Sequence, residues 1–286
     1  MEFTVVGSSG SVSGPDSPAS SYLVQAPYKD RTFTLVLDLG PGAFGALYKY
    51  LDPSRVDAFG FSHLHPDHCF DLCAYFIAAR YSPTAPWPAQ PVYGPPGTAE
   101  RIGRAYEVVQ PDGGGETGTA ISEHFHYRDW AESQSIGPFL VRTAEVEHPV
   151  KAYAIRVEET GGAAGSLVYS GDTGPSEALN ELASGVDMLV AEAAFLEGRN
   201  APGVHLTGRQ AAETAQRAAV GALVLTHIPP WHDRDEVKAQ ALPHYAGPIA
   251  LAVPGASWSI GDPSRPAAAL DDGRGRESDR RNRVTP

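Results

Sequence analysis

The segment 61–68 reads FSHLHPDH and places three histidines and one aspartate within six residues, although the whole chain has 10 histidines. The apolar run 56–61 predicts a strand, and the residues 69–80 that follow the histidines predict a helix. The histidines therefore lie on a strand-to-helix loop, where functional side chains are commonly presented. A solvated loop that is rich in histidine by chance is the alternative, but four ligating residues at fixed positions after a strand form a specific pattern.

The candidate ligands of this loop are His63, His65, Asp67 and His68. His63 and His65 are two residues apart, so their rings point the same way if the strand geometry continues. Neutral imidazoles and a carboxylate suit borderline divalent metals such as zinc. Four ligands on so short a loop exceed what one tetrahedral ion comfortably uses, which indicates two neighbouring ions. The fold therefore has to bring further ligands to this loop from elsewhere in the chain.

Three further candidate ligands each follow an apolar strand. His148 follows VRTAEVE, Asp172 lies in YSGDTG, and His227 lies in LVLTHIPP. Taken singly, each is as consistent with an ordinary core or loop residue as with a ligand. Taken with the histidine-rich loop, they complete the seven-residue set of a two-metal site.

The apolar pattern alternates between short β-rich runs and helical stretches. The predicted strands are 2–7, 20–26, 32–38, 56–61, 91–94, 120–127, 138–147, 151–158, 166–170, 187–191, 222–226 and 248–252. The predicted helices are 43–51, 69–80, 98–109, 175–183, 207–220 and 233–241. Runs of strands interleaved with helices favour two mostly mixed sheets covered by helices over a simple doubly wound parallel sheet. Within 120–127, His124 and His126 are two residues apart, and we interpret them as lying on the solvent-exposed face of a strand rather than as a metal-binding pair.

The ends of the chain and its cysteines bear on domain organisation. After residue 261 the composition changes to Pro, Ala, Asp and Arg, which predicts one folded domain over 1–261 and a disordered tail over 262–286. Cys69 and Cys73 are interpreted as small, mostly buried side chains in a reducing cytoplasm. No apolar run approaches the ~20 residues of a membrane-spanning helix. The N-terminus lacks the features of a secretory signal, so we expect a cytoplasmic location and no membrane partner.

These motifs, in this order, resemble the metallo-β-lactamase fold superfamily. The matches are H-x-H-x-D-H at 63–68, His148, S-G-D at 170–172 and T-H at 226–227, and L-D-L-G at 37–40 resembles the family's early Asp-x-Gly. The resemblance implies an α/β (α+β) fold, a four-layer αββα sandwich with the metals at one edge. It also implies a division of the ligands: His63, His65 and His148 hold one ion, Asp67, His68 and His227 hold the other, and Asp172 bridges them. Asp38 would lie beneath the metals.

Further segments resemble the phosphodiesterase branch that includes ribonuclease Z. They are the glycine-rich opening VVGSSGSVSGPDSPASSYLV, AEAAF at 191–195, and HLTGRQAAETAQRA at 205–218. The resemblance implies that His205 contacts the scissile phosphate and that Glu192 orients His205. The chain departs from ribonuclease Z in having no room between His148 and Asp172 for the long basic arm that grips tRNA. It looks closest to actinobacterial proteins that act on cyclic nucleotides.

Charge bears on the substrate. The net charge of −12 repels a phosphate backbone, so a long nucleic acid is a disfavoured substrate, whereas bound metal ions can draw in a small anion. Our hypothesis is a metal-dependent phosphodiesterase that converts 3′,5′-cyclic nucleotides (cAMP or cGMP) to 5′-nucleotides through a metal-bridged hydroxide. In this hypothesis Asp67 orients the hydroxide, and His205 acts on the phosphoryl or leaving oxygen while Glu192 holds its tautomer.

Other functions stay open at this stage. The chain resembles enzymes that trim tRNA 3′ ends strongly enough for that activity to be considered, with docking supplied by the second subunit of a homodimer, which is common in this branch. Lactonase or thioesterase activity is a second alternative, because the same metals polarise carbonyl groups. A protein that keeps the fold for binding without turnover is a third, against which the complete ligand set argues. Two divalent ions are expected, zinc foremost, although the same ligands accept manganese or iron.

Overall fold

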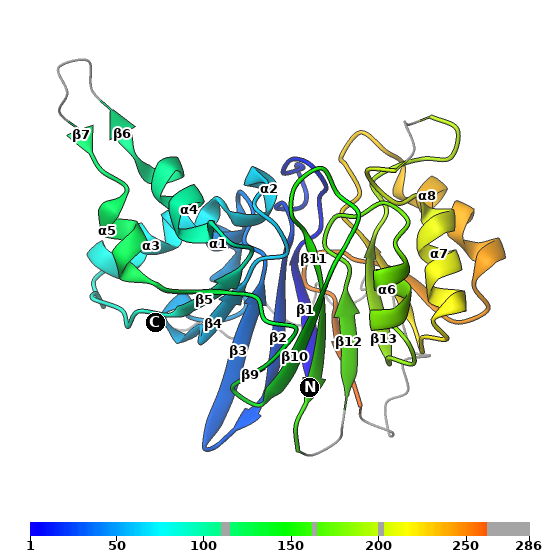
Figure 1. Cartoon of the computed structure of the whole chain (residues 1–286), viewed down its shortest axis with the longest axis horizontal. Coiled ribbons are helices and arrows are strands. Elements are labelled where there is room, and N and C mark those ends of the chain that lie inside the picture. Colours follow the sequence, from blue (N-terminus) through cyan, green and yellow to red (C-terminus); the bar gives the residue numbers. More distant parts are fainter. Residues whose placement is uncertain (110–114, 162–164, 200–202, 262–286) are drawn as a thin grey trace.

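Two seven-stranded sheets face each other and carry helices on their outer sides (Figure 1). The structure is a computed structural model, and it describes residues 1–109, 115–161, 165–199 and 203–261. The predicted tail, 262–286, lies outside the described residues. The predicted four-layer αββα sandwich is confirmed. None of the helices in the described ranges has the length and hydrophobicity that crossing a bilayer requires.

Each sheet combines an antiparallel part with a parallel part. The first sheet has the order β16 (Ser257–Ser259), β1 (Glu2–Gly7), β2 (Ser21–Tyr28), β3 (Arg31–Leu37), β4 (Ala58–Gly60), β5 (Pro91–Gly94) and β8 (His126–Asp129). The second has the order β15 (Ile249–Leu251), β14 (Leu223–Thr226), β13 (Met188–Glu192), β12 (Ser166–Tyr169), β11 (Tyr153–Glu159), β10 (Phe139–Glu145) and β9 (Ser133–Ile136). Strands β3, β4, β5 and β8 pair in parallel, as do β12 to β15. A separate short pair joins β6 (Val108–Val109) to β7 (Gly115–Glu116).

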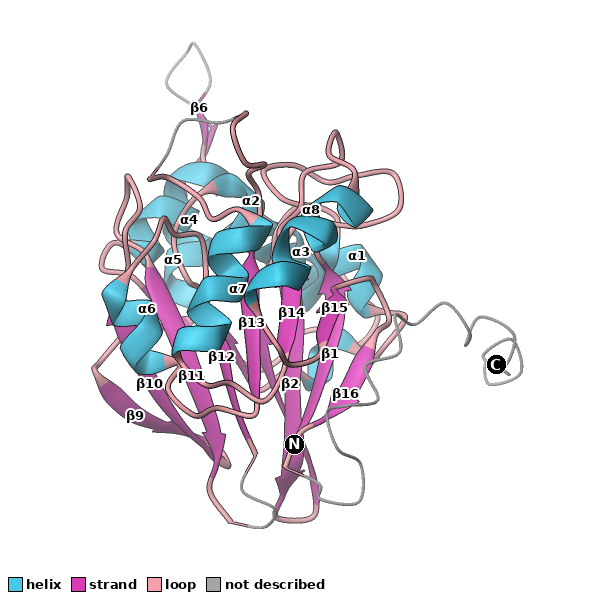
Figure 2. Cartoon of the chain, turned by 90° about the vertical axis from the view of Figure 1, so that its right-hand side faces the viewer, coloured by secondary structure: helices cyan, strands magenta, loops and turns pink. Residues whose placement is uncertain are grey.

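Helices cover the outer face of each sheet. The first sheet is covered by α1 (Ala43–Leu47), α2 (Pro66–Cys69), α3 (Asp71–Tyr81), α4 (Thr98–Tyr106) and α5 (Thr119–His124). The second is covered by α6 (Glu177–Leu182), α7 (Gly208–Arg217) and α8 (Arg234–Ala241), which stand in front of it in Figure 2. Two 3-10 turns, Pro53–Arg55 and Leu242–His244, complete the helical elements of the described chain. Thr207 and Gln210 form a capping box at the start of α7.

Side-chain alternation buries both faces of the central strands. In β3, Leu35 and Leu37 point into the core between the sheets, whereas Val36 packs under the helices. In the second sheet, Val190 enters the same inter-sheet core while Leu189 faces the helices. Strands that are buried on both faces read as continuous apolar runs, which is why the sequence locates them.

The predicted strand 120–127 is wrong over its first part, where the chain forms α5. Ile121 and Phe125 are four residues apart, which is a helical spacing, and the segment packs on α4, where a Cβ at Gly118 would lie 2.2 Å from the carbonyl oxygen of Gly103. This close backbone approach and the burial of Ile121 favour the helix. His124 therefore ends α5 against the Phe76 ring, and only His126 lies on the exposed side of a strand. The predicted helix 69–80 is in place as α3, although a separate turn, α2, precedes it. The predicted helix 98–109 ends earlier, at Tyr106, and β6, β7, β9 and β16 were not expected.

Parallel pairing decides where the functional residues gather. Because β3 is parallel to β4, the chain leaves both strands at the same edge, which brings residues 38–40 beside the histidine-rich loop. Strands β12, β13 and β14 end at the corresponding edge of the second sheet, so the residues that follow them face this loop across the sandwich.

Phe139 tests the inter-sheet core. It is fully buried, and its ring meets that of Phe33 edge-on. We expect Phe139→Ala to lower the free energy of unfolding by about 3–5 kcal/mol, because the opposing sheets cannot close the cavity. Urea denaturation followed by circular dichroism measures this. Tyr81→Ala, at a residue that is 64% exposed, is the control and should change it by no more than about 0.5 kcal/mol. Equal losses in the two variants would contradict this account of the core.

Candidate metal centre

The first group of converging ligand atoms comes from His63, His65, His148 and Asp172. His63 and His65 follow β4, whereas His148 follows β10 of the opposite sheet. His65 Nδ1 lies 3.0 Å from His63 Nε2 and 3.1 Å from His148 Nε2. Asp172 Oδ2 is 3.8 Å from His63 Nε2. Three loops, after β4, β10 and β12, thus place three ring nitrogens and one carboxylate oxygen around one point.

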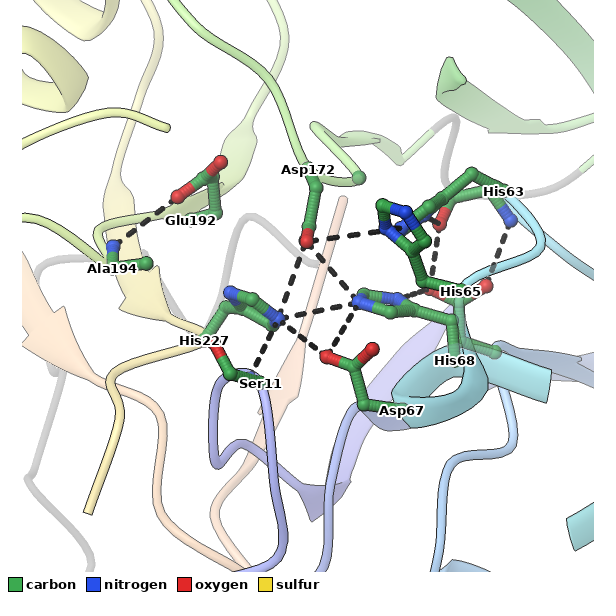
Figure 3. A network of polar contacts seen from close by, with 12 residues as sticks. Ser11, His63, His65, Asp67, His68, Asp172, Glu192, Ala194 and His227 are labelled. Atoms are coloured by element: carbon green, nitrogen blue, oxygen red, sulfur yellow. Dashed lines mark hydrogen bonds and ion pairs between the residues drawn. The ribbon is translucent and has the colours of Figure 1, made fainter. Parts of the chain in front are cut away.

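The second group comes from Asp67, His68, His227 and the same Asp172 (Figure 3). His68 Nε2 and His227 Nε2 are 3.2 Å apart, and Asp67 Oδ2 lies 3.3 and 3.2 Å from them. Asp172 Oδ1 lies 3.3 Å from His68 Nε2 and 3.4 Å from His227 Nε2. Asp172 therefore turns one carboxylate oxygen toward each group, as a ligand shared by two ions would.

Local structure explains how one loop serves both groups. His65 is extended and is the N-cap of α2, and Pro66 occupies the first helical position, where its fixed φ is favourable. The chain therefore turns into a helix after His65, which directs Asp67 and His68 to the second group. Gly40 permits this packing, because a Cβ there would lie 1.9 Å from the Asp67 carbonyl oxygen.

The spacing of these atoms fits a pair of metal ions. Zinc bonds of 2.0–2.1 Å in a tetrahedron place neighbouring ligand atoms about 3.3–3.4 Å apart, close to the separations within both groups. Asp172 Oδ1 is buried and has no hydrogen-bond partner, which is costly unless a cation satisfies it. The donor set of imidazoles and carboxylates also suits divalent ions such as zinc. The His/Asp clusters are thus suited to divalent metal binding.

The second nitrogen of several rings is held away from the centre. His68 Nδ1 lies 2.7 Å from Asp38 Oδ2, His148 Nδ1 donates to the Val204 carbonyl oxygen at 3.2 Å, and His63 Nδ1 lies 3.1 Å from Ser62 Oγ. Such partners fix the tautomer and orient the ring, so that the Nε2 lone pair faces the ion.

The electrostatics of the centre keep the imidazoles of the first group neutral and Asp67 ionised. Burial lowers the pKa of His63 and His65 and lowers that of His148 to about 4, so these rings stay neutral. Burial opposes the ionisation of Asp67, but hydrogen bonds from His227 and His68 outweigh it and hold the pKa of Asp67 below its ordinary value. These are the protonation states that metal ligands require. His68 differs, because burial opposes its protonation but the carboxylates of Asp172 and Asp38 outweigh burial and raise its pKa, so a metal ion bound there would displace a proton.

Asp38 supports the histidine-rich loop from below. It is fully buried, and its backbone adopts a positive φ of 55°. Its Oδ1 accepts the Ser62 amide at 2.7 Å, and its Oδ2 accepts the Ser62 hydroxyl at 2.8 Å and the Tyr169 hydroxyl at 2.7 Å, beside His68 Nδ1. A strained residue held by this many partners is typical of functional sites.

Glu192 and His205 lie together beside the second group. Glu192 is fully buried and accepts hydrogen bonds from the amides of Thr173 and Ala194 and from His205 Nδ1, the last at 2.8 Å. The His205 ring stacks on His227 with centroids 5.7 Å apart. Burial favours the neutral form of His205, but the Glu192 carboxylate outweighs it and raises the pKa of His205 to about 9.

The structure brings all of the predicted site residues into one region, including the three proposed for catalysis, Asp67, Glu192 and His205. Ser62, Tyr169 and Ser11 also contact the site, although the sequence did not predict them as site residues. The Ser11 amide donates to His227 Nε2 at 3.3 Å from a backbone with φ of 60°. Ser62 and Tyr169 each adjoin a ligand motif and Ser11 lies in the glycine-rich opening, but no pattern in the sequence identifies the partners of these residues.

Comparison with known proteins bears on this arrangement. Residues 34–228 match the family model for the beta-lactamase superfamily domain. An uncharacterized protein of Mycobacterium leprae is 41% identical over 268 residues, 93% of this chain and 90% of that protein. A ribonuclease Z of Mycobacterium bovis is 30% identical over 253 residues, 80% of this chain and 86% of that protein. The crystal structure of the metallo-beta-lactamase fold protein YhfI from Bacillus subtilis superposes with a TM-score of 0.75 at 23% identity, over 90% of this chain and 99% of that one.

His65 tests the metal centre, because its Nδ1 contacts both other histidines of the first group. We expect His65→Ala to lose at least one of two bound ions, measured as metal per chain by plasma mass spectrometry. His126→Ala, which removes an exposed histidine of β8, is the matched control and should keep the wild-type metal content. An unchanged metal content in His65→Ala would contradict the assignment of His65 as a ligand.

Proposed function

The chain belongs to the β-lactamase superfamily, in its ribonuclease Z-like branch of metallo-hydrolases, and from this premise we propose that it hydrolyses 3′,5′-cyclic nucleotides to 5′-nucleotides. The observation that carries the proposal is the Glu192–His205 pair beside the second ligand group. A cationic histidine at the edge of a dinuclear centre suits a substrate with a phosphoryl oxygen and a poor leaving group. A carbonyl substrate has less need of a cationic histidine at this position.

Size and charge favour a small anionic substrate. The described residues between His148 and Asp172 lie mainly in the two strands β11 and β12 of the second sheet, so none of them forms the long basic arm that grips tRNA. The net charge of the chain is −12, so a polynucleotide backbone is repelled beyond the immediate neighbourhood of the metal centre. A cyclic nucleotide carries one phosphodiester charge, and the centre alone can attract it.

The chemistry is divided between bound ions and side chains. When bound, two divalent cations supply a hydroxide nucleophile near neutral pH and neutralise charge on the phosphoryl oxygens. Zinc is our proposal for both sites. Asp67 belongs to the second group and can orient the nucleophile by accepting a hydrogen bond from it. Asp172 connects the two ligand groups, because one of its oxygens faces each group.

His205 acts on the leaving group. Its Nδ1 is held by Glu192, which leaves Nε2 for the substrate. The pKa of about 9 means that both ring nitrogens carry protons near neutral pH. As water oxygen bonds to phosphorus and the bond from phosphorus to the 3′ oxygen breaks, His205 can donate its Nε2 proton to that oxygen. The product from cAMP is 5′-AMP.

Processing of tRNA 3′ ends is the second candidate, favoured by the 30% identity to a ribonuclease Z over most of both chains. The same centre would then act on a linear phosphodiester. The acidic charge of the chain argues against it unless another surface or subunit provides the docking site.

A substrate panel tests the proposed function. The protein is purified without added metal, its ions are counted, and cAMP, cGMP, bis(p-nitrophenyl) phosphate, a precursor tRNA and a simple lactone are assayed in parallel after zinc or manganese loading. We expect the highest kcat/KM on a cyclic nucleotide and loss of all turnover after chelation. Preferential cleavage of the precursor tRNA, or of the lactone, would overturn the proposal in favour of the corresponding alternative.

His205 tests the division of labour. We expect His205→Ala to retain its metal ions and to lose about 10²–10⁴-fold in kcat on the cyclic nucleotide, because a proton donor is removed. Metal content and steady-state kinetics are measured on the same preparation. His244→Ala, a histidine of the second 3-10 turn, serves as the control and should keep wild-type kcat. Loss of metal from His205→Ala would show that His205 is a ligand instead.

A further inference from the structure

Two buried tyrosines cross between the sheets beneath the metal centre, in opposite directions. Tyr22 projects from β2 of the first sheet, and its hydroxyl lies 2.6 Å from Thr226 Oγ1 at the end of β14 in the second sheet. Tyr169 projects from the end of β12 in the second sheet, and its hydroxyl donates to Asp38 Oδ2 at 2.7 Å, just after β3 in the first sheet. The two rings pack on each other with centroids 4.9 Å apart. We call these two tyrosines the tyrosine clasp.

Each hydrogen bond of the clasp ends next to a candidate metal ligand. Thr226 immediately precedes His227, whose backbone has a positive φ of 55°. Asp38 holds His68 through its Nδ1 at 2.7 Å. Tyr22 of the first sheet thus binds the residue before His227 in the second half. Tyr169 of the second sheet binds Asp38, which holds His68 in the first half. Both ligands belong to the second group, where their Nε2 atoms are 3.2 Å apart.

The second group depends on the alignment of the two sheets. Asp67 and His68 come from the first half of the sandwich, whereas Asp172 and His227 come from the second half. A site of this kind functions only when its atoms are held within about 0.5 Å of the required geometry. The remaining contacts across the inter-sheet core are mainly apolar, and apolar contacts tolerate small shifts better than hydrogen bonds do.

The hydrogen bonds of Asp38 show which of its partners connects the two halves of the sandwich. Its carboxylate interacts with four donors, of which the Ser62 amide, the Ser62 hydroxyl and His68 Nδ1 come from the first half. The fourth donor, the Tyr169 hydroxyl, comes from the second half. Both tyrosines are fully buried, and burial raises the pKa of Tyr22 to about 12, so its hydroxyl keeps its proton. A shift of one sheet against the other would break both of these hydrogen bonds between the halves.

We propose that Tyr22 and Tyr169 are positioning residues that hold the two halves of the second ligand group at the separation an ion requires. The inference rests on the metal centre of the proposed function, but on no particular substrate. The clasp acts through Thr226 and Asp38 and touches neither the ions nor the reacting atoms. Its removal should therefore weaken metal binding more than it weakens the fold.

The test measures Zn²⁺ binding directly, without substrate. Apo-protein is titrated with Zn²⁺ in competition with a chromophoric chelator, for wild type, Tyr22→Phe, Tyr169→Phe and the double variant. We expect each single variant to bind at least one of its ions about 10–100-fold more weakly, as loss of a partner of a metal ligand typically does. Because the two hydrogen bonds align the same sheets, the effects of the two changes should not be additive.

The chain offers a matched control in Tyr75, which is fully buried in the outer core of the first sheet among Phe44, Phe59 and Trp87. Tyr75→Phe makes the same chemical change and should bind Zn²⁺ as wild type does. Thermal unfolding of the apo forms records any general destabilisation. If Tyr169→Phe does not fold, Thr226→Val removes the partner of Tyr22 with little change in volume and should weaken Zn²⁺ binding as Tyr22→Phe does.

The outcomes are distinct. Two results would overturn the proposal that the tyrosine clasp positions the ligands. One is wild-type Zn²⁺ affinity in folded Tyr22→Phe and Tyr169→Phe, and the other is an equal loss of Zn²⁺ affinity in Tyr75→Phe. Failure of the protein to hydrolyse cyclic nucleotides would overturn the proposed function and leave the Zn²⁺ titrations unaffected.

Discussion

The buried Asp38 carboxylate is the interaction on which the rest of the site depends. It receives hydrogen bonds from the loop that carries the ligands, from His68 itself and from Tyr169 of the opposite sheet. A charge buried this deeply is stable only when its acceptor sites are filled. Loop, ligand and opposing sheet must therefore all be in place together, which couples the assembly of the centre to the closure of the sandwich.

The architecture places ligands from both halves where parallel strands end. In each sheet an antiparallel part leads into a parallel part, and the parallel strands present their carboxyl ends at one edge. Short loops after these strands carry the ligands, so the position of each depends on the rigid sheet beneath it. Backbone strain at Asp38 and His227, both with φ of 55°, is tolerated because the surrounding contacts hold these residues.

Electrostatics give this acidic chain a local site for an anion. The rings of the first group are neutral because they are buried, whereas Asp67 stays ionised through its contacts with His68 and His227. His205 adds a positive charge at the edge of the centre, maintained by a carboxylate that is itself shielded from solvent. This positive charge beside the ligand groups supports the proposal of a small anionic substrate.

The sequence by itself determined the ligand types, their order and most of the strands, because a histidine-rich loop and doubly buried strands are local patterns. It also predicted the pairing of Glu192 with His205, through a resemblance and not through any pattern in the chain. Only the tertiary structure decided that residues 119–124 form a helix, since their close packing on α4 is invisible in the sequence. It alone revealed the contacts of Tyr22 with Thr226 and of Tyr169 with Asp38. Partners so far apart in the chain leave no periodic signal, because their meeting depends on how two complete sheets close on each other.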